Sequence, residues 1–328
     1  NRLELTGRDV HRFLDRMVCG AVPKKPGRVG LCYLLNRHGA LKCEATIANL
    51  PASPRGPDRV WYGSAAASER HDMDWLTAHL RPDEDVAVRS LTNAQTILVL
   101  AGPKARDVLS AASRGDWSRE AFPWLSAREA HVGVAPATVL GVSFSGELAY
   151  EIHVPNESLH AAYAALRRAG EAYGLRLFGA RAVESMRLEK GFLHWKADIL
   201  TEFDPFETGL DRFVRSDKAD FVGKDALMRR REAGPRRRLV ALSLETREAP
   251  AHGGASVRTS VGASGEVVGT VASADWGHRT GLNLAYAFVD PALAREGAEL
   301  SVDVLGVAVP AKVIPSAPYD PGHGRMRA

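Results

Sequence analysis

The spacing of apolar residues near the start of the chain predicts a helix. Residues 6–9 resemble a capping box, with Asp9 in the place of the usual Glu. Apolar side chains then recur at intervals of three and four residues, which is the period of one helical face. An amphipathic helix is therefore expected over residues 10–18, with an apolar face made of Val10, Phe13, Leu14, Met17 and Val18.

Two strands are predicted next. Residues 29–35 are almost wholly apolar, which is typical of a strand buried on both faces. Residues 41–50 alternate between polar and apolar side chains, so Lys42, Glu44 and Thr46 share one face. Glu44 is therefore predicted to point away from the apolar layer on the opposite face.

Helix and strand signals alternate over the rest of the first 235 residues. Residues 51–58 are rich in Pro and Gly and predict a loop. The later elements follow from short apolar runs and from helical spacing. We expect strands over 85–91, 96–101, 136–144 and 149–154, and helices over 105–112, from Asn156, and over 180–190.

The pattern changes near residue 236. An Arg- and Pro-rich connector over 229–238 is followed by short apolar runs separated by Gly, Asp and Pro, without a long helical pattern. These runs cover residues 239–244, 265–272, 282–289 and 299–313. The chain is therefore predicted to be an α+β protein that ends in a small β-barrel domain.

Composition removes several classes of function. The 328 residues are 45% hydrophobic and 25% charged, which is ordinary for a globular protein. No run of 18 apolar residues occurs, so no membrane span is expected. The net charge of +4 comes from scattered Arg residues, apart from the runs at 229–231 and 236–238, which we expect to be a solvated connector. Without interleaved aromatic residues, these runs predict no nucleic-acid partner.

The cysteines and the first residues of the chain indicate the cellular compartment in which the protein is expected. Cys19, Cys32 and Cys43 lack the spacing of a zinc site or a redox pair, so buried, reduced thiols and a cytoplasmic location are expected. The chain begins at Asn1 with neither an initiator Met nor a secretory signal. We expect it to be a piece of a longer polypeptide.

Several chemistries lack their sequence signatures. The chain has no GxGxxG motif after a strand, no GxxxxGK[ST] phosphate loop, no HExxH motif and no GxSxG motif. It is therefore not expected to carry its own flavin, nicotinamide, metal ion or nucleophile.

Six segments, in order, resemble glycine-cleavage T-proteins, the aminomethyltransferase family. Residues 144–151 read FSGELAYE, close to the family's YTGExGxE, and residues 220–227 read DFVGKDAL, close to DFIGKEAL. The other four lie at residues 36–47, 185–191, 198–207 and 265–273. Each match is weak by itself, but their order over most of the chain is specific.

Two further segments resemble one branch of this family. Residues 203–214 and the sequence PYDP at 318–321 look like the folate-binding carboxy-terminal part of dimethylglycine and sarcosine dehydrogenases. In that branch a flavin domain lies upstream in the same polypeptide. The resemblance implies tetrahydrofolate as the bound cofactor, with FAD present only through a missing upstream domain or a partner subunit.

The resemblance also implies a reaction. The flavin part oxidises an N-methyl amine to an iminium, and tetrahydrofolate attacks the iminium carbon to give 5,10-methylenetetrahydrofolate. The site must hold the folate nitrogens near that carbon and exclude water. It must also supply an anion that stabilises the cation and accepts a proton. Glu44 stands where the family has its essential Asp, which implies this catalytic role; alternation alone would make it an exposed strand carboxylate.

The family pattern places the folate-binding residues. Glu151 matches the family's folate-anchoring Glu, whose carboxylate can accept hydrogen bonds from pterin N–H groups. Phe144 replaces a Tyr, so stacking is retained but the hydroxyl hydrogen bond is lost. Trp61 and Trp195 also stand at Tyr positions; they either flank the folate or belong to the core.

One position departs from the family. The family's folate-contacting Arg falls at Val183, and Arg181 is the nearby candidate to replace it, although on a helix it points elsewhere. Arg187 is expected to be structural and to pair with a buried carboxylate.

The resemblance further implies three lobes around a central channel that holds the folate. Residues 1–235 would form the folate-binding domain, with residues 56–136 inserted as a second α+β lobe. The β-barrel domain would cover residues 236–328.

Three alternatives stay open. The chain resembles stand-alone T-proteins and also folate-dependent O- or S-demethylases, which share the fold. Relatives that act in iron–sulfur cluster maintenance carry the motif KGCYxGQE, whereas residues 190–197 here read KGFLHWKA without a Cys.

Overall fold

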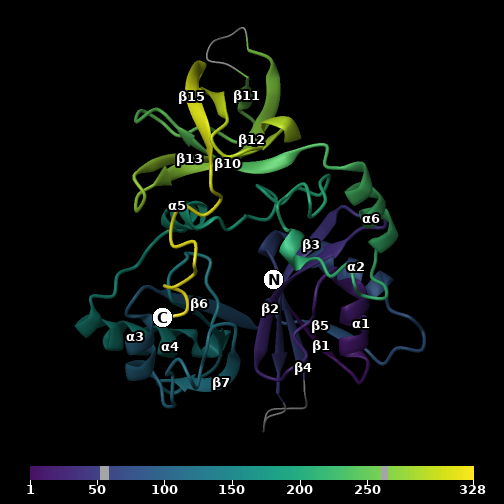
Figure 1. Cartoon of the computed structure of the whole chain (residues 1–328). Coiled ribbons are helices and arrows are strands. Elements are labelled where there is room, and N and C mark those ends of the chain that lie inside the picture. Colours follow the sequence, from purple (N-terminus) through teal and green to yellow (C-terminus); the bar gives the residue numbers. More distant parts are fainter. Residues whose placement is uncertain (52–58, 260–264) are drawn as a thin grey trace.

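The computed structural model describes residues 1–51, 59–259 and 265–328. The loop expected over 51–58 lies outside these residues, except for Pro51. Two α+β lobes and a β-barrel surround the middle of the molecule (Figure 1). Within the described ranges, no helix is long and apolar enough to cross a membrane.

The first lobe is an antiparallel sheet of five strands in the order β2-β3-β4-β1-β5. One face packs against helices α1 and α2, through an apolar core that includes Phe13, Leu14 and Leu76 from the helices and Leu34, Ala45 and Ile47 from the sheet. The elements are β1 (Arg2–Thr6), α1 (Val10–Met17), β2 (Arg28–Leu35), β3 (Leu41–Leu50), β4 (Arg59–Gly63), η1 (Ala66–Ser68), α2 (Glu69–Ala78) and β5 (Ala87–Ser90).

The predicted helix and the two strands of this lobe are confirmed, but the capping box is not. Thr6 ends strand β1, and the Asp9 side chain accepts a hydrogen bond from the backbone N–H of Asp85 at 2.9 Å instead of capping α1. Strand β2 is not buried along its whole length either, because Leu31 is 37% exposed.

The second lobe is a four-stranded antiparallel sheet in the order β6-β9-β8-β7, covered on one face by α3 and α4. Its elements are β6 (Gln95–Ala101), α3 (Ala105–Ala112), β7 (Ala127–Val132), β8 (Ala135–Leu140), β9 (Ala149–Pro155), η2 (Asn156–Ser158), α4 (Leu159–Gly170) and η3 (Glu171–Tyr173).

The expected boundary of the inserted lobe, residues 56–136, is corrected by this pairing. Strands β4 and β5 both pair with β1, so residues 59–90 belong to the first lobe. Strands β8 and β9 pair with each other and with β7 and β6, which extends the second lobe to residue 155 and into α4. Long-range strand pairing, which local spacing does not reveal, sets both limits.

A connecting region joins the second lobe to the barrel. It contains α5 (Ala180–Lys190), η4 (Asp211–Phe213) and α6 (Lys224–Ala233). The Arg run at 229–231 is therefore helical and not part of an irregular connector. Arg230 lies 3.7 Å from the carboxylate of Asp204, and Arg236 pairs with Glu207 at 3.0 Å, so two of these cations have buried anionic partners.

The barrel is closed, with strand order β10-β13-β12-β11-β14-β15. Its strands are β10 (Arg238–Leu244), β11 (Ser256–Arg258), β12 (Val267–Gly277), β13 (Leu282–Val289), β14 (Glu299–Val304) and β15 (Val307–Ile314), with η5 (Pro291–Leu293) after β13. The run at 299–313 is two strands joined by a tight turn. From the barrel, the last residues run back past α5 to the second lobe (Figure 1), where Met326 is buried.

The three cysteines are free and buried, as expected. Burial raises the pKa of the Cys19 and Cys32 thiols to about 12 and that of the Cys43 thiol still further. These thiols are therefore protonated and unreactive at neutral pH.

Candidate functional site

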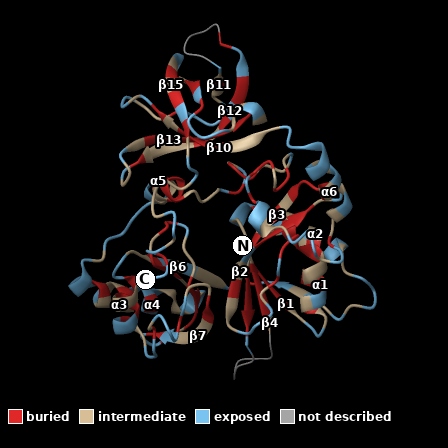
Figure 2. Ribbon diagram, in the orientation of Figure 1, coloured by how far each residue is buried: buried red, intermediate tan, exposed pale blue. Residues whose placement is uncertain are grey.

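The second face of the first sheet is covered at both ends and open between them. At one end, residues of the loop after α5, including Trp195 and Ile199, pack on Tyr33 and Leu41. At the other end, strands of the second lobe pack on the sheet through Val29, Ala48, Trp61, Ala127 and Leu140. The positions between these two contacts, Leu31, Glu44 and Thr46, are partly exposed. We call these three residues the open strip. Figure 2 shows buried segments, in red, along strands β2, β3 and β4 of this sheet.

Glu44 lies in the open strip on β3, directly opposite Tyr33 of β2. The predicted alternation holds, because Cys43 and Ala45 are buried while Glu44 is partly exposed. Its Oε2 atom has no hydrogen-bond partner in the part of the chain that the structure describes. Burial, together with the negative charge of Asp198, raises the pKa of Glu44 to about 8. Glu44 is therefore a carboxyl group that exchanges its proton near neutral pH.

Asp198 is the fixed anion beside Glu44. It forms a fully buried ion pair with Arg187, and it accepts a hydrogen bond from the backbone N–H of His194 at 2.9 Å. The Ser273 hydroxyl of the barrel donates to its other oxygen at 2.5 Å. The expected pairing of Arg187 with a buried carboxylate is confirmed.

Glu151 lies on β9, on the face turned away from the helices of the second lobe. Its side chain is 33% exposed, and its cross-strand neighbour Val99 on β6 is 53% exposed. Its Oε2 atom contacts Nε2 of His153 at 3.1 Å and lies 4.0 Å from the guanidinium of Arg2. Burial opposes ionisation of Glu151, but these two partners outweigh it and hold the pKa of Glu151 below its usual value.

Arg2 connects the two lobes at this point. Its guanidinium lies against Gly63, where a Cβ atom would approach Nη1 to 2.9 Å, and Gly63 pairs with Thr46 of the open strip. The same guanidinium lies over the ring of Trp61, 5.1 Å from its centroid. Trp61 is 2% exposed and donates its indole N–H to Glu4 at 3.2 Å, so it lies beneath Arg2 as part of the core.

Phe144 follows β8, and its ring is 41% exposed. It is nearly parallel to Phe192, with ring centroids 6.5 Å apart, and the edge of His194 lies 6.1 Å away. Because the backbone of His194 binds Asp198, this aromatic group adjoins the Asp198–Arg187 pair beside Glu44.

The remaining two predicted residues lie elsewhere. Trp195 is buried, and its indole N–H donates to the Ser68 hydroxyl at 2.9 Å, which places it in the core behind Tyr33. Arg181 lies in the first turn of α5, is exposed, and makes no hydrogen bond or ion pair within the described residues.

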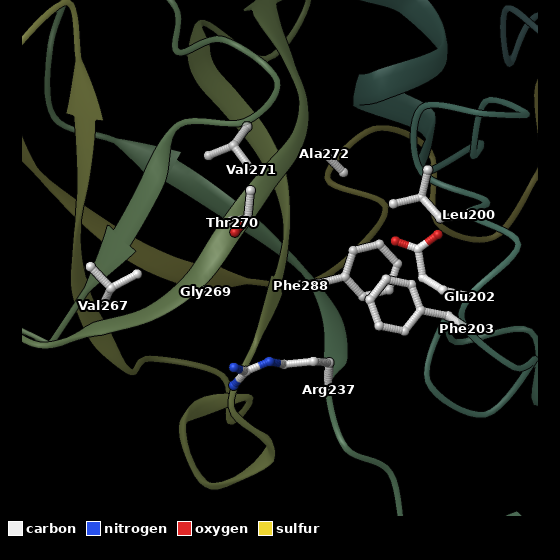
Figure 3. A pocket seen from close by; sticks show the side chains of 10 residues that line it. All are labelled: Leu200, Glu202, Phe203, Arg237, Val267, Gly269, Thr270, Val271, Ala272 and Phe288. Carbon is white, nitrogen blue, oxygen red and sulfur yellow. The ribbon is translucent and has the colours of Figure 1, made fainter.

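A separate pocket of about 270 Å³ lies where the barrel meets the loop after α5 (Figure 3). Its floor includes the stacked rings of Phe203 and Phe288, whose centroids are 3.9 Å apart, and Arg237 and Glu202 lie at its edges. None of the predicted site residues lines it.

One group of metal-capable side chains occurs among the described residues: Cys43, His71 and Asp72. Asp72 already accepts hydrogen bonds from the hydroxyls of Ser64 and Tyr62 at 2.5 and 3.3 Å, and Nδ1 of His71 lies 2.9 Å from its other oxygen. These bonds account for the buried carboxylate without a metal ion.

Comparison with known sequences decides the family. Residues 1–218 match the sequence model of the GCVT N-terminal domain, and residues 237–320 match that of the glycine cleavage T-protein C-terminal barrel domain. The chain belongs to the glycine-cleavage T-protein family.

Relatives of two kinds lie within this family. The chain is 31% identical to human mitochondrial dimethylglycine dehydrogenase over 330 residues, which is 99% of this chain but 37% of that protein. It is also 31% identical to an aminomethyltransferase of Symbiobacterium thermophilum, over 91% of this chain and 78% of that protein. The chain thus spans little more than a third of the dehydrogenase that it matches.

A solved T-protein confirms the fold. The glycine cleavage system aminomethyltransferase T from Bartonella henselae superimposes with a TM-score of 0.83 at 23% identity, covering 97% of this chain and 84% of that one. The predicted α+β fold with a carboxy-terminal β-barrel is confirmed.

Three residues near Glu151 in this T-protein family member were not predicted from the sequence: Arg2, His153 and Val99. Period two in β9 could have identified His153, because residues 151 and 153 share a face. Val99 could be identified only from the register of β6 and β9, which pairs it with Glu151. Arg2 lies at the start of an edge-proximal strand, and no local pattern marks it.

Proposed function

We propose that this chain transfers one-carbon units to tetrahydrofolate, forming 5,10-methylenetetrahydrofolate from the iminium product of a dimethylglycine- or sarcosine-like N-methyl amine. The observation that carries this proposal is the partly buried carboxyl of Glu44 in the open strip, at the position of the family's essential acid, with an Oε2 atom that finds no hydrogen-bond partner among the described residues. Family membership and the likeness to dimethylglycine dehydrogenase support it.

The chain offers suitable groups for a reduced folate. A pterin presents N–H donors and a flat apolar ring, so it needs a carboxylate acceptor beside exposed apolar side chains. Glu151 and its cross-strand neighbour Val99 provide this combination, and Phe144 adds an exposed ring. Tetrahydrofolate supplies the nucleophilic nitrogens that take up the one-carbon unit.

Glu44 acts as the electrostatic and acid–base group in this reaction. Its carboxyl group is mostly protonated in the free protein, because its pKa is about 8. A cationic iminium beside it lowers that pKa, so the carboxyl ionises and stabilises the cation. The carboxylate then accepts the proton released by the attacking nitrogen and returns it to the amine nitrogen, whose bond to the one-carbon unit breaks. The demethylated amine leaves, and the second folate nitrogen closes the methylene bridge with loss of its own proton. Burial, and after it the negative charge of Asp198, sets this starting pKa of Glu44.

Oxidation of the amine belongs to another protein or domain. The electrons of the N-methyl amine must pass to a flavin, and the dehydrogenase relative is named for such an oxidation. The partner we propose is therefore an FAD-dependent dehydrogenase domain or subunit that delivers the iminium to the open strip.

Product partition during amine oxidation tests this function. A flavin-dependent dimethylglycine dehydrogenase is supplied with its substrate, tetrahydrofolate and this chain, and free formaldehyde and 5,10-methylenetetrahydrofolate are both quantified. We expect the chain to increase the folate product at the expense of formaldehyde, and Glu44→Gln to abolish this shift. An unchanged partition with the wild-type chain would contradict the proposal.

A further inference from the structure

His153 lies directly behind Glu151, where no ligand can reach it. Both residues point to the same face of β9, but His153 is only 1% exposed. Its ring packs edge-on against Trp61, 5.5 Å between centroids, and it contacts both Arg2 and Glu151. A histidine in this position acts on a ligand only through its neighbours.

The hydrogen-bonding capacities of the three groups fix the proton on the ring. A guanidinium can only donate, so the ring nitrogen that binds Arg2 must be an acceptor. Nη2 of Arg2 lies 2.8 Å from Nδ1 of His153. An ionised carboxylate can only accept, so Nε2, which lies 3.1 Å from Glu151, must carry the hydrogen. The 3.2 Å approach of Nη2 to Nε2 is then a contact without a hydrogen bond.

Arg2 is itself strongly constrained. It is 4% exposed and lies over Trp61, and among residues 1–51, 59–259 and 265–328 it has no hydrogen-bond partner at Nε or Nη1. The bond to His153 is therefore its main polar contact, together with the attraction of Glu151 at 4.0 Å. Replacing either His153 or Arg2 leaves the other with a buried, unsatisfied group.

We propose that Arg2 and His153 form a positioning pair for Glu151: Arg2 fixes the Nε2–H tautomer of His153, and this N–H holds one carboxylate oxygen of Glu151 so that the other stays free for ligand N–H groups. The proposal rests on the proposed function only in taking Glu151 as the ligand-binding group. Arg2 and His153 are positioning residues, because neither has an exposed donor or acceptor that meets the ligand.

The surrounding charges agree with a neutral His153. Burial and the positive charge of Arg2 lower the pKa of His153 to about 4, although Glu151 opposes this. The other charged groups nearby are the α-amino group of Asn1, which acts on Glu151, and Glu4 beneath Trp61. Glu4 is occupied by Arg59 and Arg89. The uncharged imidazole can therefore accept from Arg2 while donating to Glu151.

Nitrogen-15 NMR of the histidine side chains tests the tautomer without any ligand. In the wild-type chain at neutral pH, His153 is expected to show a protonated Nε2 and an unprotonated Nδ1, assigned through the loss of its signals in His153→Gln. A positively charged ring or the Nδ1–H tautomer would overturn the proposal.

Two substitutions then test the effect on Glu151. His153→Phe keeps a buried ring but removes both polar contacts, so the carboxyl pKa of Glu151, measured by carbon-13 NMR, is expected to rise by about one unit. His153→Gln can accept from Arg2 and donate to Glu151, so it should keep that pKa near the wild-type value. An unchanged pKa in a folded His153→Phe chain would overturn the proposal. If His153→Phe does not fold, Arg2→Met provides the same test, with the same expected rise.

These measurements distinguish failure of the positioning pair from failure of the proposed folate site. If the tautomer and the Glu151 pKa behave as expected but Glu151→Ala leaves the folate affinity unchanged, the positioning pair stands and the assignment of the folate site is wrong. If Glu151→Ala abolishes folate binding while His153→Phe changes neither the pKa nor the affinity, the folate site stands and the positioning pair is wrong.

Discussion

The charge of Asp198 acts on the carboxyl group of Glu44, although the two residues lie 154 positions apart in the sequence. Asp198 is held by Arg187 in a buried ion pair, so its position is set by α5 and by the barrel residue Ser273. The acid in the open strip therefore depends on α5 and the barrel as well as on its own sheet, and its raised pKa is a property that can be measured.

Glu44→Gln is expected to change how stability depends on pH. Because the folded-state pKa of about 8 exceeds the ordinary value of 4.5, the folded protein retains the proton that the unfolded chain loses. Stability contributed by the protonated group is therefore fully present below about pH 4.5 and is lost as the pH rises toward 8, by at most about 1.4 kcal/mol per pH unit. Urea unfolding between pH 5 and 9 measures this, with Glu157→Gln as a surface control. Parallel pH profiles for wild type and Glu44→Gln would contradict the raised pKa.

The same group predicts a pH–rate profile. If the carboxylate of Glu44 is the active form, kcat/KM for one-carbon transfer rises with pH with a midpoint near pH 8 and levels off above it, because kcat/KM reports the free protein. Asp198→Asn removes the opposing charge and should move the midpoint to lower pH. A profile that is flat from pH 6 to 9 in the wild-type chain would exclude Glu44 as the titrating group.

Arg187→Met is expected to destabilise the fold by about 3–5 kcal/mol, because it leaves the buried Asp198 carboxylate without its partner. Denaturant unfolding at pH 7 measures the loss. Arg215→Met, which breaks the exposed pair with Asp217, is the matched control and should leave the stability nearly unchanged. A similarly small effect at Arg187 would mean that the ion pair does not organise the region beside Glu44.

Val99→Asp is expected to weaken folate binding about tenfold without changing the unfolding midpoint. The new carboxylate would lie across from Glu151 and repel it, and it would remove apolar surface from the proposed pterin contact. Val134→Asp in the β7–β8 turn of the same lobe is the control, because Val134 is even more exposed. Equal affinities in the two variants would argue against a ligand at this face.

The sequence predicted the individual helices and strands of this protein better than their assignment to the two lobes. Helices over 10–18, 105–112 and 180–190 were recognised because an amphipathic helix repeats within a dozen residues. The limits of the second lobe were wrong, because β4 and β5 are assigned by pairing with β1, which lies some 60 to 90 positions away.

The predicted site residues likewise divide into those that a local motif reveals and those that depend on long-range contacts. Glu44 and Glu151 could be proposed from the sequence because each lies within a local motif, and the face of Glu44 followed from alternation. Trp61 and Trp195 could not be separated from core residues, since a buried indole and a ligand-facing one look alike in sequence; both are buried here. Arg2 could not be found, because its function depends on contact with a strand 151 positions later.

Calorimetric titration with 5-formyltetrahydrofolate tests the central claim most directly. The wild-type chain is expected to bind one equivalent, Glu151→Ala to bind at least about tenfold more weakly, and Glu157→Ala, an exposed acid after the same strand, to bind like wild type. Absence of binding by the folded wild-type chain, or equal affinity in the Glu151→Ala variant, would contradict a folate site at Glu151 and Val99.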